Sequence, residues 1–250
     1  MITTALNQRL RTLGYEVVRF PAPNWVRSRQ LMMVLLPRLG IDCVLDVGAN
    51  QGQFGRTLRE SGYQGRIVSF EPVPEAFDVL RQVAARDGNW TAFPFALGET
   101  AGSLELNITE ETVFSSFLTP LAASQEQFPT NRTLRRQTVS VRRLDEVFAE
   151  CAGSQASPRV YLKMDTQGFD LEVFRGAEGV LPSIFGMQSE ISFRPIYDGM
   201  RGYADNLTEY LGKGFEVHDF LVVNRDLDQL AVVEMDCVLI RAGALAPPRS

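Results

Sequence analysis

Residues 43–55 have the sequence CVLDVGANQGQFG, in which a short apolar run leads into a glycine-rich loop. An uninterrupted apolar run such as residues 43–47 is typical of a strand that is buried on both faces of a parallel sheet. Glycines allow the backbone to turn sharply and to approach a ligand closely, and a helix beginning near Phe54 directs its free N–H groups at the loop. The stretch therefore predicts a strand, a loop and a helix within an α/β fold.

The same alternation continues along the chain. Further strands are predicted at 66–70, 91–95, 160–164 and 185–191, and helices at 54–61, 74–86, 144–149, near 171–174 and at 205–211. This order indicates a doubly wound, mostly parallel sheet. Two last strand patterns, 215–223 and 231–241, are separated by only seven residues, which is too short for a parallel crossover. We therefore expect a Rossmann-like α/β sheet that ends in a reversed C-terminal edge strand.

The predicted elements divide the chain into two parts. Residues 1–40 form an N-terminal helical extension, in which 25–39 is the clearest helix, and residues 41–250 form one domain with an insertion at about 102–141. Within the insertion, 104–108 and 137–141 are predicted strands, and the polar segment 109–136 lacks a strong period. Because long excursions of this kind are usually functional or mobile, we expect a mobile cover beside the site.

Composition and charge exclude some classes of function. The net charge of −5 and the pI of about 5.1 disfavour unselective binding of nucleic acid. The arginines of 132–143 are either a solvated face or a contact for an anionic partner. Three cysteines without metal-ligand spacing favour reduced thiols and a cytoplasmic location. The densest apolar run, 31–36, is too short to cross a membrane, and the polar N-terminus is unlike a signal peptide.

The loop and a later acid together predict an adenosine-containing cofactor. Glu71 ends the second strand about 20 residues after Gly52, a place from which an acid can accept hydrogen bonds from both ribose hydroxyls. The glycines are spaced Gly48-x-x-x-Gly52-x-x-Gly55, so Asn50 stands where a dinucleotide fingerprint has its middle glycine. That side chain would crowd a pyrophosphate and suits a cofactor that has none. A tight strand–helix turn without a ligand is the alternative.

Motifs spread over roughly residues 42–200 resemble those of one known family. VLDVGANQG at 44–52 and SFEP at 69–72 are followed, in order, by ALG at 96–98, SSF at 115–117, VSVRRLD at 139–145, LKMDTQG at 162–168 and EISF at 190–193. The set resembles the FkbM family of methyltransferases. One departure is Thr166-Gln167, where Val or Ile and Glu are commoner, so we assign no catalytic role to Gln167.

The resemblance implies a class I methyltransferase fold, S-adenosylmethionine as the methyl donor and oxygen as the methyl acceptor. By position, it places the loop residues around the methionine end of the cofactor, Glu71 at the ribose and two further residues near the adenine. The implied cofactor-binding residues are Asp46, Gly48, Asn50, Gly52, Glu71, Ala96 and Leu97.

Methylation of a hydroxyl also needs a group that takes or weakens its proton, because a sugar hydroxyl is about as weak an acid as water, with a pKa of roughly 15.7. Asp165 follows the strand at 160–164 and is the candidate base, with Lys163 on the same face as its electrostatic partner. Glu190 is a second candidate base and, with Asp165, a candidate ligand for Mg²⁺. The alternatives are a structural Lys–Asp pair and a loop-bracing glutamate.

Four other residues were considered for the site. His218, the single histidine, lies in a predicted strand and is expected to be structural. Phe193, Pro195 and Tyr197 form either an aromatic wall for a sugar ring or part of the core.

The sequence thus predicts an S-adenosylmethionine-dependent O-methyltransferase that acts on a small sugar or polyol-type natural product, without nucleic acid or a membrane span. An N-methyltransferase, a NAD-dependent oxidoreductase and a non-catalytic adenosine-binding module are the alternatives. The last of these would keep Glu71 but would not need Asp165.

Overall fold

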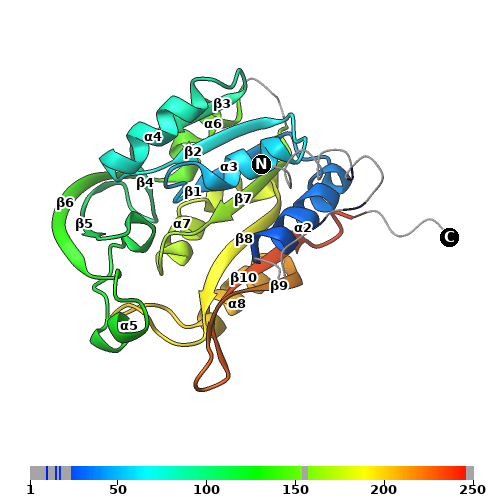
Figure 1. Ribbon diagram of the computed structural model, residues 1–250. Helices are drawn as coiled ribbons and strands as arrows, with labels where there is room; N and C mark the ends of the chain where they lie inside the picture. Colours follow the sequence, from blue (N-terminus) through cyan, green and yellow to red (C-terminus); the bar gives the residue numbers. More distant parts are fainter. Residues whose placement is uncertain (1–9, 11–14, 16, 18–23, 154–156, 246–250) are drawn as a thin grey trace.

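The computed structural model describes residues 10, 15, 17, 24–153 and 157–245 (Figure 1). Half of the predicted N-terminal extension lies outside the described residues, and its C-terminal part is the helix α2 (Asn24–Leu39). In the described ranges, no helix combines the length and the apolar character that a membrane crossing requires. The thiols of Cys43, Cys151 and Cys237 are buried and free, and burial raises the pKa of each to about 12.

A seven-stranded sheet with the order β3-β2-β1-β7-β8-β10-β9 forms the centre of the molecule. Its strands are β1 (Cys43–Val47), β2 (Arg66–Phe70), β3 (Trp90–Phe93), β7 (Val160–Met164), β8 (Ile184–Ser192), β9 (Phe215–Asp226) and β10 (Ala231–Arg241). The first five of these in the sheet order are parallel, as predicted, because each is reached by a crossover that contains helical structure.

The reversed C-terminal strand is confirmed, although its place differs from the expectation. β10 pairs antiparallel with both β8 and β9, so it lies between them and β9 takes the edge of the sheet. The short connection makes β9 and β10 antiparallel neighbours but does not decide which of them pairs with β8. Chain connectivity alone could not have placed β10 inside.

Helices cover both faces of the sheet. Residues of α2, α3 (Gln53–Glu60) and α4 (Pro74–Ala84) pack against one face, where Val44, Ile67 and Tyr161 are buried. Residues of α6 (Leu144–Ala152), α7 (Asp170–Arg175), the 3-10 segment η2 (Glu178–Ser183) and α8 (Tyr203–Gly212) pack against the other face. Strands buried on both faces explain the continuous apolar runs from which they were predicted.

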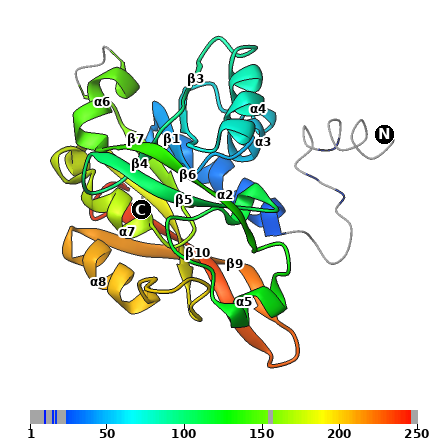
Figure 2. The same cartoon turned by 90° about the vertical axis from the view of Figure 1, so that its left-hand side faces the viewer.

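The insertion forms a sheet of its own. β4 (Ala96–Leu97), β6 (Thr133–Arg142) and β5 (Gly102–Thr109) pair in that order and lie at the left of the molecule in Figure 1, on the side that faces the viewer in Figure 2. The segment between β5 and β6 was expected to be without regular structure, but it contains η1 (Thr112–Phe114) and α5 (Ala122–Gln127). Leu106 and Ile108 pack on Val73 and Ala76, which fixes the small sheet beside the carboxyl ends of β1 and β2.

Candidate active site

The loop after β1 is held between the two neighbouring strands. The N–H groups of Gly48 and Ala49 both donate to the carbonyl of Phe70, at 3.1 Å. Gly48 has a φ of 73°, and a Cβ atom there would lie 2.0 Å from the carbonyl oxygen of Asp165. Only glycine fits so close an approach of two backbones. The loops after β1, β2 and β7 therefore meet at one point.

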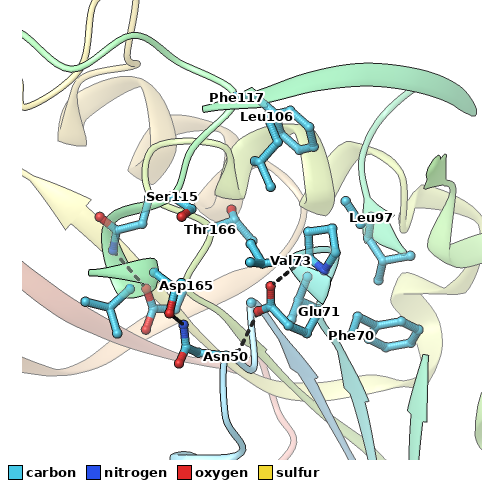
Figure 3. A pocket seen from close by; sticks show the side chains of 17 residues that line it. Asn50, Phe70, Glu71, Val73, Leu97, Leu106, Ser115, Phe117, Asp165 and Thr166 are labelled. Atoms are coloured by element: carbon cyan, nitrogen blue, oxygen red, sulfur yellow. Dashed lines mark hydrogen bonds between the residues drawn. The ribbon is translucent and has the colours of Figure 1, made fainter. Parts of the chain in front are cut away.

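Asn50 connects this loop to Glu71 and to the insertion. It has a φ of 46°, its N–H donates to Glu71 Oε2 at 2.8 Å, and its Nδ2 donates to Thr112 Oγ1 at 2.9 Å. Glu71 Oε1 accepts the N–H of Val73, also at 2.8 Å (Figure 3). The carboxylate thus fixes the ends of two loops, while each of its oxygens keeps a free lone pair.

Burial raises the pKa of Glu71 to about 7, against the two backbone hydrogen bonds and the more distant charge of Lys163, which lower it. The side chain is 5% exposed. A carboxyl group that titrates near neutral pH in a cleft is typical of a functional site.

A cavity opens above these loops. Six predicted site residues line it: Gly48, Asn50, Glu71, Ala96, Leu97 and Asp165. The remaining lining residues are Val47, Phe70, Pro72, Val73, Leu106, Thr112, Val113, Ser115, Phe117, Thr166 and Gln167. The cavity has an acidic end at Glu71 and Asp165 and an apolar end between Phe70, Leu97 and Leu106.

The insertion supplies five of these lining residues, and the sequence argument missed them as site residues. It placed the segment beside the site, but its polar composition gave no reason to choose Thr112, Val113, Ser115 or Phe117. Tyr197 Oη lies 3.0 Å from the carbonyl oxygen of Phe114, which places the segment against Tyr197. The SSF motif at residues 115–117 was the one available signal.

Two predicted cofactor residues do not line the cavity. Gly52 has a φ of 82° and caps the N-terminus of α3, and a Cβ there would lie 3.0–3.2 Å from Leu80 and Trp90. The close packing of Leu80 and Trp90 against this position therefore explains why it is a glycine. Asp46 is fully buried in β1, where the hydroxyl of Ser69 donates to it at 3.4 Å. Gly52 and Asp46 therefore shape the elements on either side of the loop and do not line the cavity themselves.

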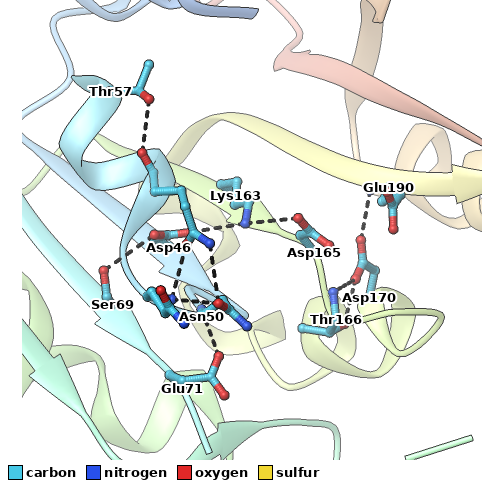
Figure 4. Close-up of polar contacts among 12 residues, drawn as sticks. Asp46, Asn50, Thr57, Ser69, Glu71, Lys163, Asp165, Thr166, Asp170 and Glu190 are labelled. Carbon is cyan, nitrogen blue, oxygen red and sulfur yellow. Dashed lines mark hydrogen bonds and ion pairs between the residues drawn. The ribbon is translucent and has the colours of Figure 1, made fainter. Parts of the chain in front are cut away.

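Lys163 lies between two carboxylates (Figure 4). Its Nζ is 3.2 Å from Asp46 Oδ1 and 3.3 Å from Asp165 Oδ2, and its side chain is 7% exposed. Burial alone would lower the pKa of Lys163, but the charges of Asp165 and Asp46 outweigh burial and hold it above its usual value. Burial raises the pKa of Asp46, and the charge of Lys163 opposes that rise. The predicted Lys163–Asp165 pair is therefore present and extends to Asp46.

Gln167 links the two candidate catalytic acids. Its Nε2 donates to Asp165 Oδ1 at 3.2 Å and to Glu190 Oε2 at 2.8 Å, while Tyr197 Oη donates to its Oε1 at 2.7 Å. Gln167 has a φ of 54°, an uncommon backbone conformation for a residue with a side chain, and such strain gathers at functional sites. The sequence argument set Gln167 aside, because only the fold shows that its amide contacts both acids.

The proposed Mg²⁺ ligands do not form a convincing metal site. The Gln167 amide donates to both Asp165 and Glu190, so N–H groups point at the oxygens that would face a cation. Within the part of the chain that the structure describes, no three His, Cys, Asp or Glu side chains are grouped so as to hold a metal ion.

Glu190 is more deeply buried than its predicted place at a strand end implied. It lies in β8 and is 9% exposed, and burial, together with the charges of Glu234 and Asp165, raises its pKa well above the usual value. Its N–H donates to Asp170 Oδ2 at 2.9 Å. Asp170 also accepts the N–H of Thr166 at 2.8 Å and so braces the loop after β7.

The four remaining candidates lie outside the cavity. His218 is exposed on the edge strand β9. Phe193 stacks on Tyr203 with ring centroids 4.5 Å apart, and Pro195 is exposed. Tyr197 is 1% exposed and acts through its hydroxyl group. These residues do not form an aromatic wall at the cavity, because the chain turns away after β8.

Comparison with known proteins agrees with this geometry. Residues 46–222 match the family model described as "Methyltransferase FkbM domain". The chain is 28% identical over 155 residues to "Methyltransferase sdnD" of Sordaria araneosa, a match that covers 54% of this chain and 60% of that protein. It is 24% identical over 201 residues to "2-O-methyltransferase NoeI" of Sinorhizobium fredii (strain NBRC 101917 / NGR234), covering 78% of this chain and 80% of that protein.

Among solved structures, the chain is similar to methyltransferase FkbM from Methylobacillus flagellatus KT, with 16% identity and a TM-score of 0.47. That match covers 79% of this chain and 43% of the other. The chain thus spans less than two thirds of the first curated relative and less than half of this solved protein.

Proposed function

Because the chain belongs to the FkbM methyltransferase family, we propose that it is an S-adenosylmethionine-dependent methyltransferase that acts on a hydroxyl of a sugar or polyol-type natural product. The observation that carries the proposal is the cavity in which Glu71, Asn50 and Asp165 meet at the carboxyl ends of β1, β2 and β7. Parallel α/β sheets bind their ligands at this edge. Membership of a methyltransferase family disfavours the alternative of a NAD-dependent oxidoreductase.

The residues of the cavity fit the cofactor. Glu71 has a lone pair free on each oxygen for the ribose hydroxyls, and little water remains to be removed from it. Ala96 and Leu97, with Phe70 and Leu106, form an apolar slot suited to the adenine. Gly48 and Asn50 face the methionine end. When bound there, S-adenosylmethionine supplies an activated methyl group.

Asp165 is the residue that we assign to the acceptor's proton. Its side chain is 37% exposed and lines the cavity, and among the described residues it accepts no backbone N–H, unlike Glu71 and Asp170. Lys163 and the Gln167 amide each contact one of its oxygens and orient the carboxylate. A base placed within reach of a hydroxyl contributes roughly 10²–10⁴-fold to the rate.

Glu190 and Lys163 support Asp165 in this proposal without taking the proton. Glu190 holds the Gln167 amide in place, and Lys163 lies 3.3 Å from Asp165 Oδ2 and orients that carboxylate. A role for Mg²⁺ at Asp165 and Glu190 would require the Gln167 amide to move away first.

Oxygen is proposed as the target because a 2-O-methyltransferase is among the relatives. The experiment combines the purified chain with tritium-labelled S-adenosylmethionine and a panel of glycosides and amines, and identifies products by NMR. Tritiated O-methyl glycoside that is absent with Asp165→Asn supports the proposal. Exclusive labelling of amines would favour the N-methyltransferase. Tight binding of S-adenosylhomocysteine without any transfer would favour the non-catalytic module.

A further inference from the structure

A second cavity lies on the other side of the loop after β1. Gly48, Asn50, Val113 and Asp165 line both cavities, so the two meet at Asp165. The second is open to solvent on one side and has a volume of about 340 Å³. Its remaining lining residues are Ser28 of α2, Ala49, Gln53 and Phe54 at the start of α3, Lys163, Gln188, Leu221, Val222 and Val223 of β9, and Asp236 of β10.

The wall made by α2 is fixed to the sheet. Arg27 of α2 lies 3.2 Å from Asp219 of β9, and residues of α2 share a core with Leu221 and Val238. The N-terminal helix therefore closes one side of the second cavity, a use that its sequence pattern did not indicate.

Gln188 has a buried oxygen that lacks a partner in this cavity. Its side chain is 4% exposed, and its Oε1 accepts no hydrogen bond within the described part of the chain. Buried polar atoms are nearly always paired, and an unpaired one is costly. Gln188 lines the cavity, so a shift of its side chain would bring this covered oxygen to a ligand hydroxyl.

The charges of the cavity select against an anionic ligand. Lys163 is the one cationic side chain among its described lining residues, and both Asp46 and Asp165 already pair with it. Asp236 adds a third carboxyl group, whose pKa burial and the charge of Asp165 raise to about 7. A carboxylate or phosphate on the ligand would meet these acids without a free cation.

The groups left for a ligand are suited to hydroxyls. A hydroxyl donates and accepts at one atom, so it can pair with an amide oxygen and with a carboxyl group in either protonation state. An ammonium group only donates. In the same cavity, Phe54, Leu221 and Val222 offer apolar surface for the C–H face of a ring.

We propose that the second cavity binds the methyl acceptor, a neutral polyhydroxylated molecule of the glycoside type, with Gln188 and Asp236 hydrogen-bonding its hydroxyls and Asp165 facing the one that reacts. The inference rests on the proposed function for the reaction itself. It adds the place of the acceptor, two specificity-determining residues and the exclusion of acidic sugars.

Binding of three matched probes tests the proposal without requiring turnover. Methyl glucoside, methyl glucuronoside and methyl glucosaminide share one ring and differ in charge. Saturation-transfer NMR measures their binding to the full chain saturated with S-adenosylhomocysteine, and calorimetry measures the affinity for S-adenosylhomocysteine itself. We expect the glucoside to bind at least tenfold more tightly than the glucuronoside and more tightly than the glucosaminide.

Variants then locate the site. Gln188→Leu and Asp236→Asn should each weaken glucoside binding at least tenfold and leave the affinity for S-adenosylhomocysteine within twofold. Val222→Trp, which fills the cavity from the half-exposed side of β9, should abolish glucoside binding. Glu216→Gln removes an exposed carboxylate from the same strand and should change nothing. Circular dichroism checks that each variant is folded.

The outcomes separate the two proposals. Glucoside binding that survives Gln188→Leu, Asp236→Asn and Val222→Trp overturns the location. Preferred binding of the glucuronoside or glucosaminide, or no binding of any probe, overturns the acceptor class. Failure of the wild-type chain to bind S-adenosylhomocysteine would instead overturn the proposed function.

Discussion

The clearest prediction concerns the proton on Glu71. In the free protein the pKa of Glu71 is about 7, raised from 4.5 mainly by burial. Because the pKa of Glu71 is higher in the folded than in the unfolded state, the free energy of unfolding falls as pH rises from 4.5 through 7. At full ionisation that decrease is on the order of 3 kcal/mol. Ribose hydroxyls that donate to the carboxylate would favour its charged form and lower the pKa.

This coupling makes cofactor binding depend on pH in a defined direction. If ribose contacts lower the pKa by about one unit, S-adenosylhomocysteine binds about five- to tenfold more tightly at pH 8 than at pH 5.5. Binding also releases a proton near pH 6.5, because the bound protein holds fewer protons than the free one. Calorimetry in two buffers of different ionisation enthalpy measures both effects.

Glu71→Ala removes both the pH dependence of cofactor binding and the proposed hydrogen bonds to the ribose. At pH 8 it should weaken binding by about 1.5–3 kcal/mol, the usual worth of hydrogen bonds to a charged group, which is roughly ten- to a hundredfold. The affinity that remains should be independent of pH. Asp236→Asn is the control, because it removes another carboxyl with a pKa of about 7 that lies outside this cavity. A pH-independent wild type, or a pH dependence that survives Glu71→Ala, refutes the assignment.

Four further predictions concern the acceptor side and the loops. Asp165→Asn should lower kcat by about 10²–10⁴ with unchanged affinity for S-adenosylhomocysteine, whereas lowered Tm with normal kcat would mean a structural role. Gln167→Glu should lower both kcat and Tm, because a third carboxylate replaces the amide between two others. EDTA should not change the kcat of the wild-type chain; a kcat that EDTA lowers and Mg²⁺ restores would contradict this expectation. Gly48→Ala should abolish cofactor binding in calorimetry, since its Cβ has no space beside Asp165. Limited proteolysis within residues 109–136 should slow when S-adenosylhomocysteine binds, and Thr112→Val should reduce that protection; equal rates in both states would mean that the segment is no cover.

The main sheet could be predicted from the sequence because its strands are buried on both faces. That burial produces apolar runs, and the predicted strand at 160–164 has the bounds of β7. The strand predicted at 91–95 ends earlier in the structure, since β3 spans Trp90–Phe93 and the chain joins another sheet as β4 from Ala96. Periodicity reports burial and does not report which strand is the partner.

The candidate site could be predicted where a residue acts from the end of a strand. Glu71 and Asp165 line the cavity because carboxyl ends of parallel strands share one edge. The cofactor role predicted for Gly52 stays a prediction, because a glycine that makes room for Trp90 looks the same in sequence as one that makes room for a ligand. Gln167 and Gln188 were not recognised, since their importance depends on contacts between strands that a single sequence does not reveal.

The acids at this edge of the sheet are better explained by function than by stability. Burial raises the pKa of Glu190, Glu234 and Asp236, so each stabilises the folded state less as pH rises through neutrality. Apolar residues of similar volume would avoid that cost. Lys163 cannot neutralise all of them, because Asp46 and Asp165 already share its charge. Glu71 and Asp236, whose pKa values burial raises to about 7, each line one of the two cavities, where carboxyl groups that exchange protons near neutral pH are suited to binding hydroxyls.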